Sequence, residues 1–299
     1  MNSDICSIIS GHIIKPEYKL YDWIKIDKIS PFFISLNPNA IEYLKRNPEY
    51  INWNCMSLNN SNEALELLKA NPKKINWNYL SSNKNPEAIK LLRNNKEKIN
   101  WIRLSGNSNR EAIDILKENP ENICWIMLSL NKNGIELLKN NIEKINWYWF
   151  SKNSNQEAMK LLKANPEKID WNTLSYNKNP EIVELLRLNP DYINWNGLCI
   201  NETDEIIDFI KEYPENINWD WLSRNSNPKA IKLLKANPEK INWKLLACNK
   251  SYEAFEMIKA NPEKINWNNY IWENPNIFYE YKDINLIKKV IEIILIKND

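Results

Sequence analysis

The stretch Asn165-Pro166-Glu167-Lys168-Ile169-Asp170-Trp171-Asn172-Thr173-Leu174-Ser175-Tyr176-Asn177 is the cleanest copy of a phrase that returns along the whole chain. Each copy carries a tryptophan, and these stand at positions 53, 77, 101, 125, 147, 171, 195, 219, 243 and 267. Every interval is 24 residues except one of 22. A fixed period of this length indicates an array of stacked repeats.

The residues before the phrase predict a longer helix in each unit. In the unit at 85 to 94, Asn85 suits the N-cap, Pro86 the first helical position, and Glu87 the positive end of the helix dipole. Apolar residues at 88, 89, 91 and 92 then form one stripe. In most units the stripe ends at the next Asn-Pro, because a residue that precedes proline is disfavoured in the α region.

A second, shorter helix is predicted around each tryptophan. In one unit it begins either at Pro72 or at Asn76 and ends by Asn83. Asn76 is the better start, because its slot holds Asn or Asp in nine of ten copies and suits an N-cap. A single α or 3₁₀ turn is long enough for this segment.

Isoleucine stands two residues before each of the ten tryptophans, and both rows are predicted to be core. A buried Trp removes about 200 Å² from water and contributes roughly 5 kcal/mol before conformational entropy is subtracted. One unit cannot bury its own Trp, so neighbours must cover it. The prediction is an elongated all-α solenoid of about ten units, roughly 90–100 Å long at 8–10 Å per unit. A sugar-stacking or cofactor-binding role for the Trp row is the alternative.

The two ends depart from the repeat and are predicted to be caps. Residues 1–30 form an N-terminal cap in which Trp23 covers the first repeat, residues 31–274 form the solenoid, and residues 275–299 form a C-terminal capping helix. The alternatives for the last stretch are a strand and a partner-binding amphipathic helix. All three parts are expected to make one continuous domain.

Composition narrows the range of partners. The net charge is +2, so no strong field attracts nucleic acid or an anionic membrane. The five cysteines are an odd number without a C-x-x-C pair, which favours reduced thiols and a cytoplasmic location. No stretch is apolar enough to span a bilayer, so a membrane partner is not expected.

No catalytic constellation is visible. The only histidine is His12, which lies outside the array, and the four glycines form no phosphate-binding loop. The paired acids fall in surface rows. We therefore expect no enzymatic activity, no metal site and no cofactor.

The pattern N-P-x-A-I-x-L-L-x-x-N-P-x-x-I-x-W-x-x-L-S-x-N resembles the short tryptophan repeats of uncharacterised proteins encoded by giant DNA viruses. The resemblance runs from about Leu20 to Phe278, with Pro31 in a Trp slot and Cys199, Ala247 and Ile271 in Ser slots. It implies a viral protein that works in an infected cell. The alternating helix lengths are also similar to leucine-rich variant repeats in architecture.

An asparagine follows each short helix, as at 83, 107, 131 and 153, and two readings of this row are open. Stacked copies would hydrogen-bond along the array and satisfy backbone groups in the bends. A base-reading code would also use a polar row, but it needs residues that vary, and these do not.

A basic residue follows the apolar stripe in every unit and is the best candidate for phosphate binding. The row includes Lys69, Arg93, Lys117, Lys139, Lys163, Arg187, Lys211 and Lys235. An acid stands four residues later in nine of ten units, so pairing or dipole compensation is the preferred explanation of the row. A nucleic-acid-binding solenoid is thus the alternative function.

Slots that differ between units are the candidates for a protein-binding surface, because packing has not fixed them. Aromatic and arginine side chains are typical of binding hot spots. They occur here at Tyr79, Arg103, Tyr148, Trp149, Tyr176, Trp221 and Arg224. Trp149 and Trp221 have a second reading, as additional core volume. The sequence predicts a scaffold that binds a host or viral protein, or a structural component of a virion or inclusion.

Overall fold

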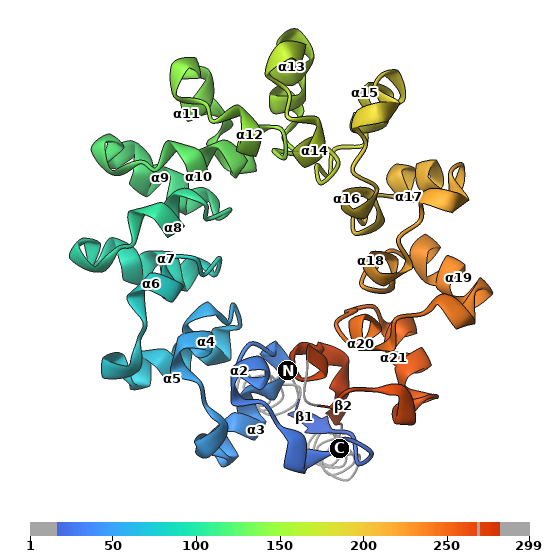
Figure 1. Cartoon of the computed structure of the whole chain (residues 1–299). Coiled ribbons are helices and arrows are strands. Elements are labelled where there is room, and N and C mark those ends of the chain that lie inside the picture. The colour runs from blue at the N-terminus through green and yellow to red at the C-terminus, as the bar shows by residue number, and fades with distance from the viewer. Residues whose placement is uncertain (1–16, 268–269, 282–299) are drawn as a thin grey trace, which may run out of the picture.

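A computed structural model describes residues 17–267 and 270–281 of the chain. The predicted all-α solenoid is confirmed, but Figure 1 shows that the array curves into a closed ring. The short helices α14 (Trp171–Leu174), α16 (Trp195–Cys199) and α18 (Trp219–Ser223) lie towards the centre. The longer helices of the same units lie towards the periphery.

Six of the ten longer helices begin at an Asn or Ser whose side chain caps the helix. Asn85, for example, accepts a hydrogen bond from the Glu87 N–H, and Pro86 takes the first helical position. These helices are α3 (Ile41–Arg46), α5 (Asn62–Ala70), α7 (Pro86–Arg93), α9 (Arg110–Glu118), α11 (Ile135–Lys139), α13 (Gln156–Ala164), α15 (Ile182–Leu188), α17 (Asp204–Lys211), α19 (Pro228–Ala236) and α21 (Tyr252–Lys259).

The short helices begin at the tryptophan slot, as predicted. Asn76 caps its helix by accepting a hydrogen bond from the Tyr79 N–H, whereas Cys124 makes no such bond. Besides α14, α16 and α18 they are α2 (Pro31–Ile34), α4 (Trp53–Leu58), α6 (Trp77–Leu80), α8 (Trp101–Ser105), α10 (Trp125–Leu130), α12 (Trp147–Phe150) and α20 (Trp243–Leu246).

Each unit has a third element that the sequence analysis did not separate. The residues from Pro72 to Lys74 form a 3₁₀ helix of their own, so Pro72 and Asn76 start two different helices. The corresponding helices are η3 (Pro48–Tyr50), η4 (Pro72–Lys74), η5 (Lys96–Lys98), η6 (Pro120–Asn122), η8 (Ile142–Lys144), η9 (Pro166–Lys168), η10 (Pro190–Tyr192), η11 (Pro214–Asn216), η12 (Pro238–Lys240) and η13 (Pro262–Lys264). Two further 3₁₀ helices of the same length, η2 (Pro38–Ala40) and η7 (Lys132–Gly134), directly precede α3 and α11.

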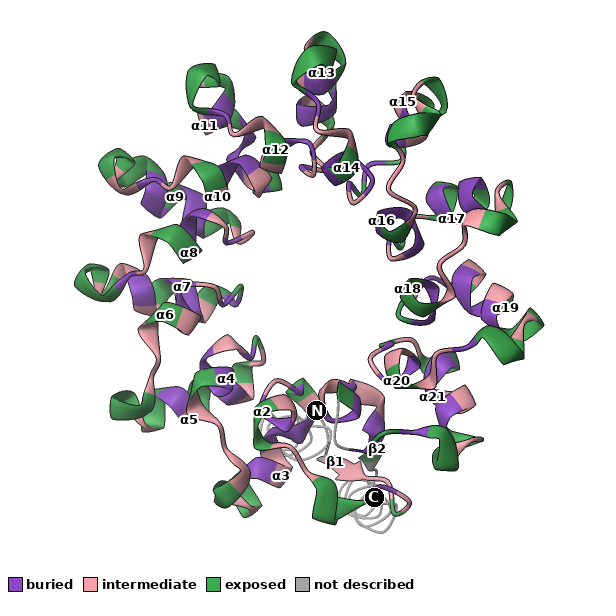
Figure 2. Ribbon diagram, in the orientation of Figure 1, coloured by how far each residue is buried: buried purple, intermediate pink, exposed green. Residues whose placement is uncertain are grey.

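The apolar core runs around the ring between the two layers of helices (Figure 2). Its members come from the predicted stripes, such as Ala88, Ile89 and Leu92 of α7, which are fully buried. The isoleucines before Trp are buried or half-buried, including Ile99 and Ile169. One shared core therefore joins all units, as stacked repeats require.

The tryptophans are less buried than predicted. Only Trp267 of the ten is buried, and the other nine are half-buried against the core. In five joints a lysine at the end of the next unit's 3₁₀ helix lies over the exposed ring face, 4.5–4.9 Å from the centroid. Lys98 covers Trp77 in this way, and Tyr192 stacks on Trp171 in the same slot. At these five joints the side chain that covers the exposed face of the Trp ring is thus a cation rather than more core.

The asparagine row forms a hydrogen-bonded ladder, which confirms the structural reading of that row. Each Asn is buried and donates its Nδ2 to two carbonyl oxygens of the preceding unit, at 2.7–3.5 Å. Its Oδ1 accepts the N–H two residues later, as from Asn155 to Asn153. Nearly the whole amide is used to satisfy buried backbone groups.

A second ladder runs through the serine slot and was missed by the sequence analysis. Ser105 Oγ donates to the Trp101 carbonyl at 2.8 Å and accepts the N–H of Cys124, in the next unit, at 2.9 Å. The same arrangement recurs at Ser57, Ser81, Ser129, Ser151, Ser175 and Ser223. Cys199 keeps the acceptor role, with Sγ 3.3 Å from the Asn218 nitrogen.

Replacing Ser105 with alanine is expected to lower the free energy of unfolding by about 1–3 kcal/mol, because the Cys124 N–H loses its acceptor. Chemical denaturation at neutral pH measures the change. Cys199→Ser places a better hydrogen-bond acceptor in the corresponding slot, so its free energy of unfolding should equal or exceed that of the native chain. A Ser105→Ala variant as stable as the native chain would show that this ladder contributes little.

The ends of the chain meet, so the solenoid is closed and not an open rod. Asn37 Nδ2 in the first unit donates to the Trp272 and Asn274 carbonyls in the last, at 3.3 and 3.0 Å. This is the bond pattern of every other joint. Eleven ladder asparagines (37, 59, 83, 107, 131, 153, 177, 201, 225, 249 and 274) therefore complete one turn. The mean rotation per unit is about 33°.

The last unit is assembled from both ends of the chain. Its short helix is η14 (Tyr270–Glu273), which packs beside α2 and is followed by η15 (Pro275–Ile277). A two-stranded antiparallel sheet then replaces the long helix, with β1 (Glu17–Leu20) paired to β2 (Phe278–Tyr281) and Tyr18 opposite Glu280. The chain returns to α2 through the 3₁₀ helix η1 (Ile26–Lys28).

These contacts change the interpretation of both predicted caps. The ring of Trp23 packs against Phe255 and Trp267 of the final units, with ring centroids 5.7 and 5.8 Å apart. The described part of the predicted capping helix at 275–299 is a 3₁₀ turn and a strand, and the remainder, from 282, lies outside the described residues.

Candidate binding surface

The basic row proposed for phosphate binding is almost entirely neutralised. Arg187 forms a two-pronged ion pair with Glu212, and Lys69 pairs with Glu87 of the next unit at 3.0 Å. Of the eight named residues, the seven with an acid partner are Lys69, Arg93, Lys117, Lys139, Lys163, Arg187 and Lys211. Lys235 has no ion pair within the described residues.

The acids in these pairs are not the ones that the sequence suggested. Lys117 and Lys211 pair with carboxylates three residues earlier on the same helix, whereas Lys69 and Lys163 reach the next unit. The acid four residues later joins none of these pairs. The ion pair with Lys163 holds the pKa of the Glu181 carboxyl below its ordinary value, and the pKa of Lys163 is raised in turn.

The five aromatic residues among the predicted protein-binding candidates lie outside the core. None belongs to the apolar core or to the half-buried side chains packed on it. Tyr148 is exposed, Trp149 is half-buried beside it with centroids 5.1 Å apart, and Trp221 is 37% exposed. Added core volume therefore does not explain Trp149 or Trp221.

Cations accompany two of these aromatic side chains. The Arg103 guanidinium lies 4.9 Å from the centre of the Tyr79 ring, and Lys152 lies 4.9 Å from that of Tyr176. Each pair joins adjacent units. The predicted residues are thus not one compact cluster, but are distributed along successive short helices.

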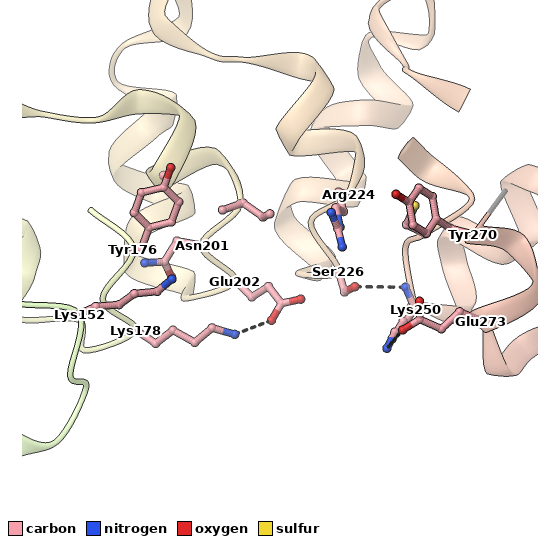
Figure 3. Close-up of a pocket in the computed structure, with 13 residues that line it drawn as sticks. Lys152, Tyr176, Lys178, Asn201, Glu202, Arg224, Ser226, Lys250, Tyr270 and Glu273 are labelled. Carbon is pink, nitrogen blue, oxygen red and sulfur yellow. Dashed lines mark hydrogen bonds and ion pairs between the residues drawn. The ribbon is translucent and has the colours of Figure 1, made fainter. Parts of the chain in front are cut away.

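A cavity of about 490 Å³ lies along the loops that follow the short helices (Figure 3). Two of the predicted residues, Tyr176 and Arg224, line this cavity. Tyr270, which was not predicted, lies at the opposite end of the cavity from Tyr176. Four cations and two acids line it, at Lys152, Lys178, Arg224, Lys250, Glu202 and Glu273. A cavity of this volume can accept a small molecule or part of a peptide.

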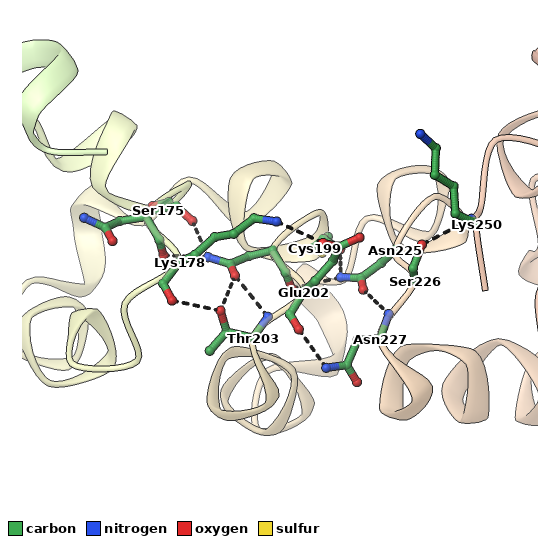
Figure 4. Close-up of polar contacts among 11 residues, drawn as sticks. Ser175, Lys178, Cys199, Glu202, Thr203, Asn225, Ser226, Asn227 and Lys250 are labelled. Carbon is green, nitrogen blue, oxygen red and sulfur yellow. Dashed lines mark hydrogen bonds and ion pairs between the residues drawn. The ribbon is translucent and has the colours of Figure 1, made fainter. Parts of the chain in front are cut away.

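Two of the cavity's cations are neutralised, and two are not. Lys178 pairs with Glu202 at 2.9 Å, and Lys250 pairs with Glu273 at 3.5 Å. Within the described residues Lys152 and Arg224 have no acid partner. The backbone of the neighbouring loops is held by hydrogen bonds of Thr203, Asn225 and Asn227 to the preceding unit (Figure 4). The lining of the cavity carries an excess of positive charge.

The described residues contain no group of three or more His, Cys, Asp or Glu side chains arranged to hold a metal ion. No helix in residues 17–267 and 270–281 is long and apolar enough to cross a membrane.

Burial makes Cys55 a pH-sensitive element of the core. Loss of solvation raises the pKa of the Cys55 thiol to about 11, from an ordinary value of 9.0. Its contribution to stability should be complete below pH 9 and lost between about pH 9 and 11, because the unfolded chain ionises first. We expect the unfolding free energy of the native chain to fall over that range by up to about 2 kcal/mol more than that of Cys55→Ala. If denaturation experiments show that the unfolding free energies of the native chain and of Cys55→Ala fall equally between pH 9 and 11, this prediction is wrong.

No protein-family model matches the chain, and neither a curated protein nor a solved structure shows significant similarity to it. The functional argument therefore depends on the geometry of the ring and the chemistry of its surface.

Proposed function

We propose that this ring is a non-catalytic scaffold that binds a protein partner through the variable slots of its short helices. The observation that carries the proposal is the position of Tyr79, Tyr148, Trp149, Tyr176 and Trp221, which lie outside the apolar core. Aromatic side chains of this kind are the usual anchors of protein interfaces. The ladders beneath them make the surface rigid, which reduces the entropy lost on binding.

Nucleic-acid binding by the outer Lys/Arg row is the weaker alternative. Seven of its eight named cations already have a carboxylate partner, so a phosphate backbone would have to displace those acids.

The resemblance to giant-virus tryptophan repeats extends the proposal: the partner is a host or viral protein, and the complex forms in the cytoplasm of an infected cell. A component of a virion or inclusion would be a structural version of the same scaffold.

Affinity purification from infected-cell extract, followed by mass spectrometry, tests the proposal. The native chain should retain a specific protein, and the triple variant Tyr79→Ser, Trp149→Ser, Trp221→Ser should lose it. Leu188→Ser is the matched control, because Leu188 is apolar and 78% exposed but belongs to a longer helix. Retention of the same proteins by all three chains, or of nucleic acid alone, would contradict the proposal.

A further inference from the structure

The residue after the tryptophan slot usually extends the polar ladders. Where it is Asn or Asp, its side-chain oxygen accepts a hydrogen bond from the N-cap asparagine of the next unit. This occurs in the pairs Asn54–Asn76, Asn78–Asn100, Asn172–Asn194, Asn196–Asn218 and Asp220–Asn242. The slot is therefore ordinarily a polar link between units.

Three consecutive units lack this hydrogen bond, because the residue after their tryptophan is neither Asn nor Asp. The slot holds Ile102, Ile126 and Tyr148, whose exposed fractions are 60%, 49% and 47%. None of these side chains is among the buried or half-buried residues that make up the apolar core. Exposed apolar residues that occur singly are ordinary, but an uninterrupted row at a position that is otherwise hydrogen-bonded indicates a surface for contact.

Cations lie on the same units. Arg103 follows Ile102 directly and is exposed, Lys132 is exposed at the start of η7, and Lys152 lies over Tyr176. Within the described residues none of the three forms an ion pair. Lys132 and Lys152 also line a cavity of about 210 Å³, which has no acidic side chain in its lining.

The apolar row and the cavity adjoin each other. Ile126 and Leu130 are four residues apart in α10 and so share a helix face, and Leu130 lines the cavity. Gly106 lines it too, and a Cβ at this glycine would lie 3.0 Å from Met127 Cε. We call Ile102, Arg103, Ile126, Lys132, Tyr148 and Lys152 the apolar–basic face.

We propose that the apolar–basic face binds an acidic amphipathic segment of a partner protein, an inference that rests on the proposed function and specifies the chemistry of that partner. Apolar side chains of the segment cover Ile102, Ile126 and Tyr148, and its carboxylates meet Arg103, Lys132 and Lys152. A phosphate backbone would gain nothing from the exposed isoleucines, so the face fits a peptide better than a nucleic acid.

Selection from a phage library of random dodecapeptides on the full-length chain tests this inference. The enriched peptides should combine Asp or Glu with Leu, Ile or Phe. In fluorescence anisotropy, Ile102→Ser/Ile126→Ser should raise the Kd of the best peptide by about tenfold or more, since central apolar contacts dominate such interfaces. Lys132→Gln/Lys152→Gln should raise the Kd and flatten its salt dependence. Leu188→Ser should leave it unchanged, and circular dichroism confirms that each variant is folded.

Enrichment of basic peptides, no enrichment at all, or equal Kd values for the native and isoleucine variants would overturn the inference. A dimer of the native chain that dissociates in Ile126→Ser would also overturn it, because the face would then join two copies. If any of these results is obtained while affinity purification still yields a protein lost in the triple variant, the proposed function stands and only the assigned face is wrong.

Discussion

Replacing Asn153 with alanine is expected to lower the free energy of unfolding by about 3–6 kcal/mol. Asn153 is fully buried and donates to the Ser129 and Asn131 carbonyls at 2.9 and 3.2 Å. It also accepts the Asn155 N–H at 3.0 Å. Alanine leaves the Ser129 carbonyl and the Asn155 N–H without a partner, at about 1–3 kcal/mol each. The Asn131 carbonyl loses one of its two bonds and keeps the one from the Gly134 N–H. Urea denaturation followed by circular dichroism measures the loss.

Asn172→Ala is the matched control for the Asn153→Ala substitution. Asn172 is exposed, and its side chain contributes only a surface hydrogen bond with Asn194. We expect a loss below about 1 kcal/mol. Equal effects of the two substitutions would mean that the buried ladder does not hold the units together.

Replacing Trp272 with alanine is the second change with a large expected effect. Trp272 is the largest fully buried side chain and lies at the joint where the two ends meet. Its Nε1 donates to the Trp267 carbonyl at 2.8 Å, and its own carbonyl accepts from Asn37. Loss of this packing should cost about 3–5 kcal/mol. Hydrogen exchange should accelerate first in β1, β2 and η14, because they form the closing unit.

Trp221→Ala is the control for Trp272→Ala, because it makes the same substitution at an exposed tryptophan. Trp221 is exposed and lies outside the core, so its replacement should change the unfolding free energy by less than about 1 kcal/mol. A small effect of Trp272→Ala, with exchange unchanged in β1 and β2, would show that closure does not depend on this side chain.

The repeat and its local chemistry could be predicted from the sequence because each unit carries the same signals. The Asn85-Pro86 start, the stripe at 88 to 92 and the cap at Asn76 depend only on neighbours in the chain. The asparagine ladder was also predictable, since an invariant polar row within an apolar array has to satisfy backbone groups.

Ring closure was not predictable in the same way, because the rotation between units is a small angle that no single residue determines. An error of a few degrees per joint, repeated ten times, separates a ring from an open superhelix. Signals of closure were present only at the ends. Asn274-Pro275-Asn276 repeats the pattern of Asn37-Pro38-Asn39, and these two stretches become neighbours.

The candidate surface was predicted only in part. Variability correctly singled out side chains outside the core, such as Tyr148 and Trp221, but whether they bind a partner stays a prediction. Ile102 and Ile126 stand in the same variable slots but were not chosen as candidates, because only aromatic and arginine side chains were selected there. Pairing of the outer cations was predicted, but with the wrong acids, because partners such as Glu212 come from the next unit and not from four residues later.

Closure of the chain into a ring is tested most directly by a disulfide across its two ends. Tyr18 and Glu280 are cross-strand partners, so cysteines at these positions, in a chain whose native cysteines are replaced, lie within disulfide range. Mild oxidation should give an internal disulfide in the monomer, seen by mass spectrometry and non-reducing electrophoresis. The control pair Lys160→Cys/Glu280→Cys, with Lys160 on α13 across the ring, should give none. Absence of the internal disulfide in the first variant, or equal formation in both, would contradict the closed ring.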